Sequence, residues 1–182
     1  MKTRLFIVLV ALLGASCKTN GRNSYLTVTK MVLGTPSGTA CKYDPSADES
    51  DFASIDPAAN TGGTMGVVLQ NNLKDPSTVN TLFNANSATF HPHQVVADYE
   101  VIGGTTLAGQ IIPVSGTQVA AGGSAPVLVP FFSPAATATL IGEIRVTFHV
   151  EGKLDDGSVV KSSEHEYIFL TCSTAGCNSA CL

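Results

Sequence analysis

Residues 143–151, EIRVTFHVE, decide the fold class of this 182-residue chain. Apolar and polar side chains alternate along them, and a period of two is that of a strand with one buried face. Asp155-Asp156-Gly157 follows as a turn signal, because glycine accepts the positive φ angle that tight hairpin turns require. Residues 159–171 then return as a strand that ends in YIFL. The stretch therefore predicts a β-hairpin.

The rest of the chain consists of short apolar segments separated by clusters of Gly, Pro, Asn and Ser, without a sustained helical period. Pro126 and Pro130 cannot donate to a ladder, so the apolar run that contains them predicts an edge or bulged strand. Residues 133–139 predict one helical turn or a crossover. Further strands are expected over residues 25–33, 64–73, 94–101, 110–114 and 125–132.

Two polar segments are predicted to be connections. Residues 44–63 show almost no periodicity and predict a long surface loop. Residues 75–86 predict a second connection, with Leu82 and Phe83 turned inward. About seven strands remain, which predicts an all-β protein with a single immunoglobulin-like or fibronectin-like sandwich. The pairing order of the strands cannot be read from the sequence.

The N-terminus has the pattern of a secretory signal. Lys2 and Arg4 precede an apolar run over residues 5–13, and small residues follow at 14–16. The apolar run is shorter than the ~20 residues that span a bilayer, which argues against the alternative of an N-terminal membrane anchor. We therefore expect a signal peptide over residues 1–16, a tether over 17–23 and a sandwich domain with a cysteine-containing tail over 24–182.

Cys17, directly after this segment, resembles the lipidated cysteine of the bacterial lipobox. Ala15 and Ser16 fit that motif, whereas Gly14 occupies a position where the family prefers leucine. The resemblance implies that the thiol of Cys17 is acylated, becomes the mature N-terminus and attaches the protein to the membrane. Lys18 in place of aspartate favours the outer membrane. The alternative is ordinary signal cleavage that leaves Cys17 free.

Charge narrows the set of partners. The chain has 10 basic and 14 acidic residues, and removal of Lys2 and Arg4 with the signal leaves a net charge of about −6. Nucleic-acid binding, which requires clustered Lys and Arg, is not expected. The negative net charge also argues against holding anionic lipid headgroups through surface charge, so membrane attachment is expected to come from the lipid.

Four cysteines remain after Cys17, and in an exported chain they predict two disulfides. The first expectation pairs Cys41 with Cys172 and Cys177 with Cys181, because the first and last strands are expected to lie side by side. Four cysteines allow three connectivities, and a zinc site built from the same residues is the alternative. No C-x-x-C redox pair is present.

Other candidate sites are weaker. His91 and His93 could face the same way in an extended segment and bind a metal, but a loop that leads into a strand is the simpler interpretation. His149 and His165 are predicted to face solvent. The acidic residues between Asp44 and Asp56 could hold calcium but lack the EF-hand order. No catalytic motif is found, and no cofactor is expected.

Several stretches together are similar to uncharacterised lipoproteins of the myxobacterial and deltaproteobacterial kind. They are the signal with Cys17, Cys41-Lys42-Tyr43, the strand VVLQNNL at 67–73, the hairpin at 152–157 and the cysteine-ended tail. The resemblance implies an envelope location and a β-sandwich, and brings no known activity.

These observations predict a non-enzymatic binding or structural module of the envelope, with an unidentified protein partner. A small metal-binding protein or enzyme that works through His91, His93 or the acidic loop is one alternative. A subunit of an extracellular assembly is the other, with residues 125–132 open to an added strand.

Overall fold

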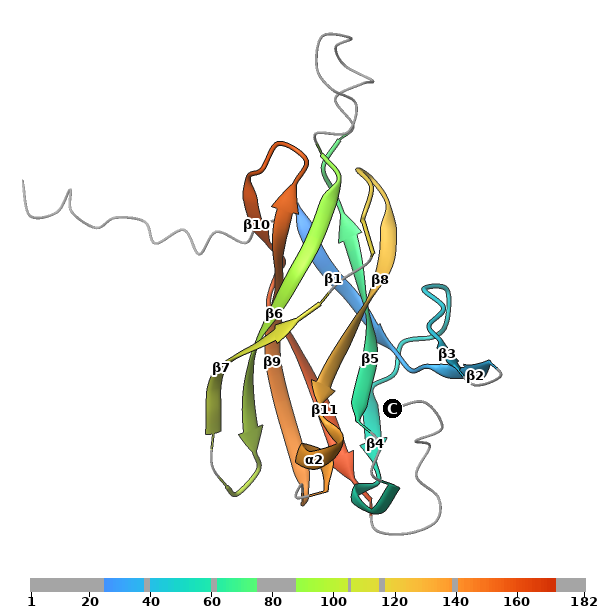
Figure 1. Cartoon of the computed structure of the whole chain (residues 1–182), viewed down its shortest axis with the longest axis vertical. Helices are drawn as coiled ribbons and strands as arrows, with labels where there is room; N and C mark the ends of the chain where they lie inside the picture. The colour runs from blue at the N-terminus through green and yellow to red at the C-terminus, as the bar shows by residue number, and fades with distance from the viewer. Residues whose placement is uncertain are drawn as a thin grey trace, which may run out of the picture.

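The computed structural model describes residues 25–37, 40–59, 62–74, 88–104, 106–114, 117–138 and 141–172. Nearly all of its regular structure is β (Figure 1). The strands are β1 (Leu26–Val32), β2 (Thr35–Ser37), β3 (Ala40–Lys42), β4 (Phe52–Ile55), β5 (Gly63–Asn71), β6 (Phe90–Val101), β7 (Thr106–Pro113), β8 (Ser124–Phe132), β9 (Glu143–Leu154), β10 (Val159–Lys161) and β11 (His165–Thr171). The single-turn helices are η1 (Pro57–Ala59) and α2 (Pro134–Thr137).

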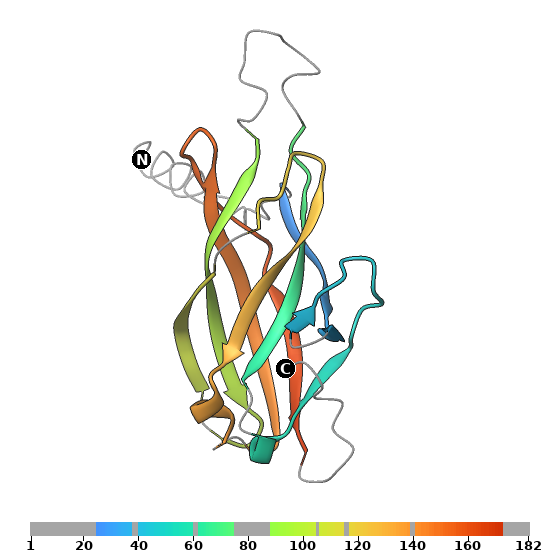
Figure 2. The same ribbon diagram turned by 45° about the vertical axis from the view of Figure 1, so that its right-hand side comes forward.

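Two main sheets pack against each other. One has the order β1-β5-β8, and the other has the order β4-β11-β9-β6-β7, with β10 paired to the second half of β9. The views in Figures 1 and 2 show the sheets as two elongated layers. A separate hairpin of β2 and β3 lies beside the first sheet. Within the described ranges, no helix has the length and hydropathy needed to cross a bilayer.

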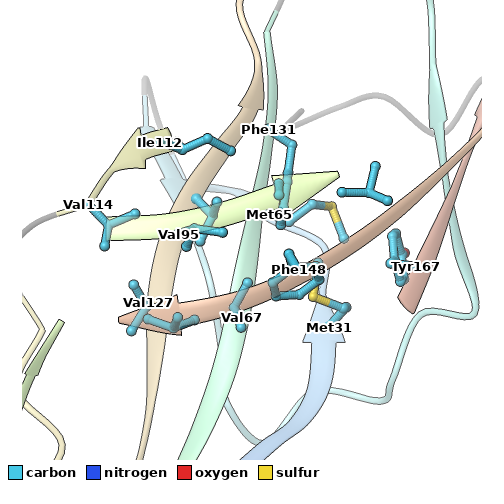
Figure 3. Packing of buried hydrophobic residues seen from close by; sticks show 14 of the residues in the cluster. Met31, Met65, Val67, Val95, Ile112, Val114, Val127, Phe131, Phe148 and Tyr167 are labelled. Carbon is cyan, nitrogen blue, oxygen red and sulfur yellow. The ribbon is translucent and has the colours of Figure 1, made fainter. Parts of the chain in front are cut away.

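The core between the sheets is built from the inward side of each alternating strand. Val67 of β5 and Phe148 of β9, each at most 1% exposed, come from opposite sheets and point into the same layer (Figure 3). Phe131 of β8 packs edge-to-face on Phe148, with 5.0 Å between ring centroids. Tyr99 of β6 also joins the sheets, because its hydroxyl donates to the Phe131 carbonyl at 2.8 Å.

The predicted hairpin is confirmed, with one difference. β9 alternates as expected, and the turn at 155–158 returns the chain antiparallel to it. The return is two strands, β10 and β11, and not one. Ser162 causes the break: its hydroxyl accepts from the Val150 N–H and donates to the Ser163 carbonyl, and the Ser163 N–H turns away to Leu26.

The prediction of a featureless loop over residues 44–63 is wrong in part. It contains β4, which pairs in parallel with β11, and η1. The expectation that the first and last strands lie side by side is also wrong. β1 pairs with β5, and β4 is the strand beside β11. Only four residues form β4, and so short a strand leaves little periodicity to recognise.

Other expected elements are found with shifted bounds. β6 begins at Phe90 instead of Gln94, and β7 covers residues 106–113 instead of 110–114. Ser133 caps the single turn of α2 by accepting from the Ala136 N–H. Seven strands have seven or more residues, in agreement with the expected number, and the other four are short. Leu82 and Phe83 lie outside the described residues.

The sandwich has two ends that differ in composition. At one end lie the start of β1, the end of β5 and the β9–β10 hairpin (Figure 1); we call Tyr25, Lys74 and residues 151–161 the hairpin end. At the opposite end lie α2, η1, the turn after β6 and the end of β11; we call residues 56–59, 102–104, 133–138 and 141–142 the far end.

Candidate functional site

The strongest grouping of polar side chains lies where β6 meets β9 and β10, next to the hairpin end. A shallow pocket there is lined by His93, Gln94, Glu151, Gly152, Lys153 and Val159. β6 and β9 are antiparallel neighbours, and their register places Gln94 opposite Glu151. Two histidine–carboxylate pairs and one amide–carboxylate pair accompany the pocket.

Glu151 is the centre of this network. The Gln94 amide donates to its Oε2 at 2.8 Å, and His149 Nε2 lies 3.0 Å from its Oε1. These hydrogen bonds, the one from Gln94 first, hold the pKa of Glu151 below its ordinary value because they stabilise the ionised carboxylate. Glu151 is therefore a fixed acceptor with both oxygens engaged.

His91 and His93 do not act together. A β-bulge between Pro92 and Gln94 inserts His93 as an extra residue, so the simple alternation that would align it with His91 is broken. His91 Nε2 pairs with Asp155 Oδ1 at 2.5 Å, whereas His93 is exposed and lines the pocket. The prediction that His91 and His93 form a loop before the strand is wrong, because both residues lie inside β6.

Gly152 explains why the backbones of β6 and β9 lie so close together at this point. A Cβ there would lie 2.1 Å from the His91 carbonyl oxygen and 2.7 Å from the Phe90 ring. Any larger residue would push β6 away from β9 and dismantle the pocket. The close approach of β6 to β9 therefore requires glycine at position 152.

The network consists of carboxylates, imidazoles and one amide. In the part of the chain that the structure describes, no three His, Cys, Asp or Glu side chains converge to hold a metal ion. The described partners of His91 and His149 are carboxylates, not hydroxyl or thiol groups that could act as nucleophiles. The pocket offers one cation, one imidazole and an occupied carboxylate to a small polar ligand.

The acidic loop is organised by its own backbone. Asp44 accepts from the N–H and hydroxyl of Ser46, which lowers the pKa of Asp44, the hydroxyl bond being the larger cause. Asp56 caps the N–H of Ala58 in the same manner. These carboxylates are turn-forming acceptors. The alternative of a calcium loop therefore has no converging ligand set among the described residues.

The two remaining histidines differ. His149 lies on the outer face of β9, as predicted, although its pair with Glu151 leaves its side chain only 18% exposed. His165 was predicted to face solvent, and this is wrong: its ring packs edge-to-face on Phe148, with 5.6 Å between centroids. Burial lowers the pKa of His165, and the nearby Glu49 carboxylate opposes that shift. The alternation of β11 places His165 in phase with the inward Tyr167 and Phe169.

The cysteines lie mostly beyond the described residues. Cys41 is exposed on β3, and Cys172 follows β11, where its N–H donates to the Ile55 carbonyl. Both are disulfide-bonded cysteines. Cys17, Cys177 and Cys181 fall outside the described ranges. The pairing among Cys41, Cys172, Cys177 and Cys181 therefore stays a prediction.

The sequence did not reveal that Gln94, Glu151 and Lys153 lie together beside one pocket. The alternation of β9 places Glu151 and Lys153 on one face, so half of the network could have been found. The contribution of β6 could not, because it depends on the bulge at His93. The sequence matches no protein-family model, and no curated protein shows significant similarity to it.

Proposed function

We propose that the chain is an envelope-anchored lipoprotein, with the outer membrane favoured, whose single sandwich is a non-enzymatic binding or structural module. One observation carries the proposal. β1 begins at Leu26, nine residues after Cys17, and enters the sandwich at one of its ends. A short tether that leads directly into the end of an elongated domain suits a module held upright at a bilayer.

The strand order supports an immunoglobulin-like identity. β1 pairs with β5 in one sheet, and β4 pairs in parallel with β11 in the other sheet. The N-terminal part of the chain therefore contributes a strand to each sheet. The β11-β9-β6-β7 sheet opposes β1-β5-β8, as expected for a two-sheet Greek-key sandwich. The chain has no tryptophan that could occupy the core. Smaller side chains, such as those of Val67 and Phe148, fill the space between the sheets instead.

Two disulfides among Cys41, Cys172, Cys177 and Cys181 belong to the same proposal. The oxidised state of Cys41 and Cys172 supports an oxidising compartment. Peptide mapping of the unreduced protein should find all four cysteines in two bridges and Cys17 in none. A bridge that includes Cys17 would refute the lipid attachment.

The direct test is metabolic labelling with a clickable fatty acid. The wild-type protein should incorporate the label and fractionate with the membranes, and the Cys17→Ser variant should do neither. Cys41→Ser is the matched control, because it removes a thiol without removing the attachment site. A wild-type protein without label would refute the proposal.

The assembly alternative has one specific observation in its favour. Ile102 and Ile141 at the far end are 47% and 83% exposed, and the charged residues described at that end are few. A photo-crosslinking residue at 141 should capture a discrete envelope protein in living cells, whereas the same residue at 107, exposed on β7, should not. Equal capture at both positions would speak against a dedicated far-end contact.

A further inference from the structure

We infer that the hairpin end faces the lipid bilayer and that its lysines contact anionic headgroups. The inference rests on the proposed lipid attachment at Cys17. It goes further by assigning an orientation to the sandwich and by naming the residues that meet the membrane. Three observations carry it: the reach of the tether, the distribution of charge, and the side chains exposed at this end.

The reach of the tether limits how far the hairpin end can lie from the membrane. Tyr25 comes eight positions after Cys17, and a fully extended chain covers at most about 3.6 Å per residue, so Tyr25 lies within about 29 Å of the acylated residue. Tyr25 belongs to the hairpin end, where its carbonyl accepts from the Asn72 N–H at 2.6 Å. The far end is separated from it by β9, whose 12 residues extend about 40 Å.

Charge is divided unevenly along the molecule. The hairpin end is balanced: Lys74, Lys153 and Lys161 offset Glu151, Asp155 and Asp156. The remaining described residues include three basic side chains, Lys30, Lys42 and Arg145. Against them stand ten acidic ones, namely Asp44, Asp48, Glu49, Asp51, Asp56, Asp98, Glu100, Glu143, Glu164 and Glu166.

An anionic leaflet acts on this distribution as an orienting field. It repels the acidic body of the sandwich and does not repel the hairpin end, and the effect extends over about one Debye length, ~8 Å at physiological salt. The carboxylates of the hairpin end are also partly occupied: Asp155 pairs with His91, and Asp156 accepts from Ser158.

The exposed side chains of the hairpin end suit a membrane interface. Val159 is 75% exposed and Tyr25 is 54% exposed, at positions that the core does not use. Tyrosine is enriched at the level of headgroups because its ring is apolar and its hydroxyl is polar. Lysines with flexible stems reach phosphates from the same surface.

The test uses the full lipidated protein in vesicles that contain an anionic lipid and a lipid with a nitroxide on its headgroup. A fluorescent amino acid replaces Val159 in one sample and Ile141 in another; both are highly exposed aliphatic positions, at opposite ends. Nitroxide quenching should be at least twofold stronger at position 159. Vesicle flotation of the same samples reports the anchor independently.

The outcomes separate the two proposals. Equal quenching, or stronger quenching at 141, in protein that floats with the vesicles would overturn the orientation and leave the lipid anchor standing. Protein that does not float would refute the anchor itself. Lys153→Glu with Lys161→Glu should reduce the quenching ratio in anionic vesicles and not in neutral ones, whereas Lys42→Glu should leave it unchanged. A ratio unaffected by the double substitution would overturn the role of the lysines.

Discussion

Asn71, the last residue of β5, connects three segments of the chain through hydrogen bonds of its side chain. It is 1% exposed, and its amide donates to the carbonyls of Ala88 (2.7 Å) and Val119 (3.0 Å). Its Oδ1 accepts from the Leu73 N–H. The side chain therefore links the end of β5, the entry to β6 and the segment before β8 by hydrogen bonds, in place of backbone pairing.

Asn71→Ala is expected to lower the free energy of unfolding by roughly 1 to 3 kcal/mol, because it leaves the buried Ala88 carbonyl without this donor. Urea denaturation of the Cys17→Ser protein, with and without the substitution, measures the change. The neighbouring exposed Asn72→Ala is the control and should cost less than about 0.5 kcal/mol. An equal loss of unfolding free energy for the two substitutions would contradict the stabilising role of the Asn71 side chain.

His165 predicts a dependence of stability on pH. Because burial lowers its pKa in the folded state, the unfolded chain binds the proton more readily as the pH falls through about 6.5. Stability should therefore be retained above pH 7 and decline toward pH 5. His165→Gln should flatten that decline in a series of urea midpoints. An unchanged pH dependence would show that the shift has no thermodynamic consequence.

Residue-level patterns were informative where a single rule applies. The alternation in β9 and the Asp-Asp-Gly turn predicted the hairpin, because burial of one face forces a period of two. The same alternation would have placed His165 inward had it been followed through β11. The bulge at His93 could not be predicted, since it is defined by the register of β6 against β9.

At the scale of elements, β8 is an edge strand, as its prolines predicted. It pairs with β5 alone. Pro126 lies opposite Val68, whose carbonyl accepts from Thr29 on the other neighbouring strand. Pro126 therefore directs its backbone away from β5, and Pro130, four residues later, does the same. The open edge thus lacks two N–H donors, which disfavours strand addition at β8.

Replacement of Pro126 and Pro130 by threonine should restore both donors and promote self-association, visible as earlier elution in size-exclusion chromatography. Leu128→Thr is the matched control, because that position already has an N–H on the same edge. Elution unchanged from the parent protein would mean that the prolines do not protect the edge.

Elements set by long-range pairing were the ones that the sequence could not specify. β4 exists because β11 offers it a parallel edge, and four residues carry no pattern of their own. β10 and β11 separate because Ser162 bonds to Val150 across the sheet. Both features depend on residues distant in the chain, whereas β9 is long enough to show its own periodicity.

At the scale of the whole molecule, the sandwich is polarised. Its hairpin end contains Tyr25, the residue before β1, and has balanced charge, and its far end exposes two isoleucines. With the lipid at Cys17, this polarity would present the far end to the surroundings of the membrane. The pocket beside Glu151 would then lie near the headgroups, and the Ile102–Ile141 surface would meet a protein partner.

The most direct measurement for the central claim is the intact mass of the protein extracted from native membranes. We expect the mass of residues 17–182 with two disulfides, increased by a diacylglyceryl group on Cys17, with or without an amide-linked third chain. A mass that corresponds to residues 17–182 without lipid, or to a chain that retains residues 1–16, would contradict it.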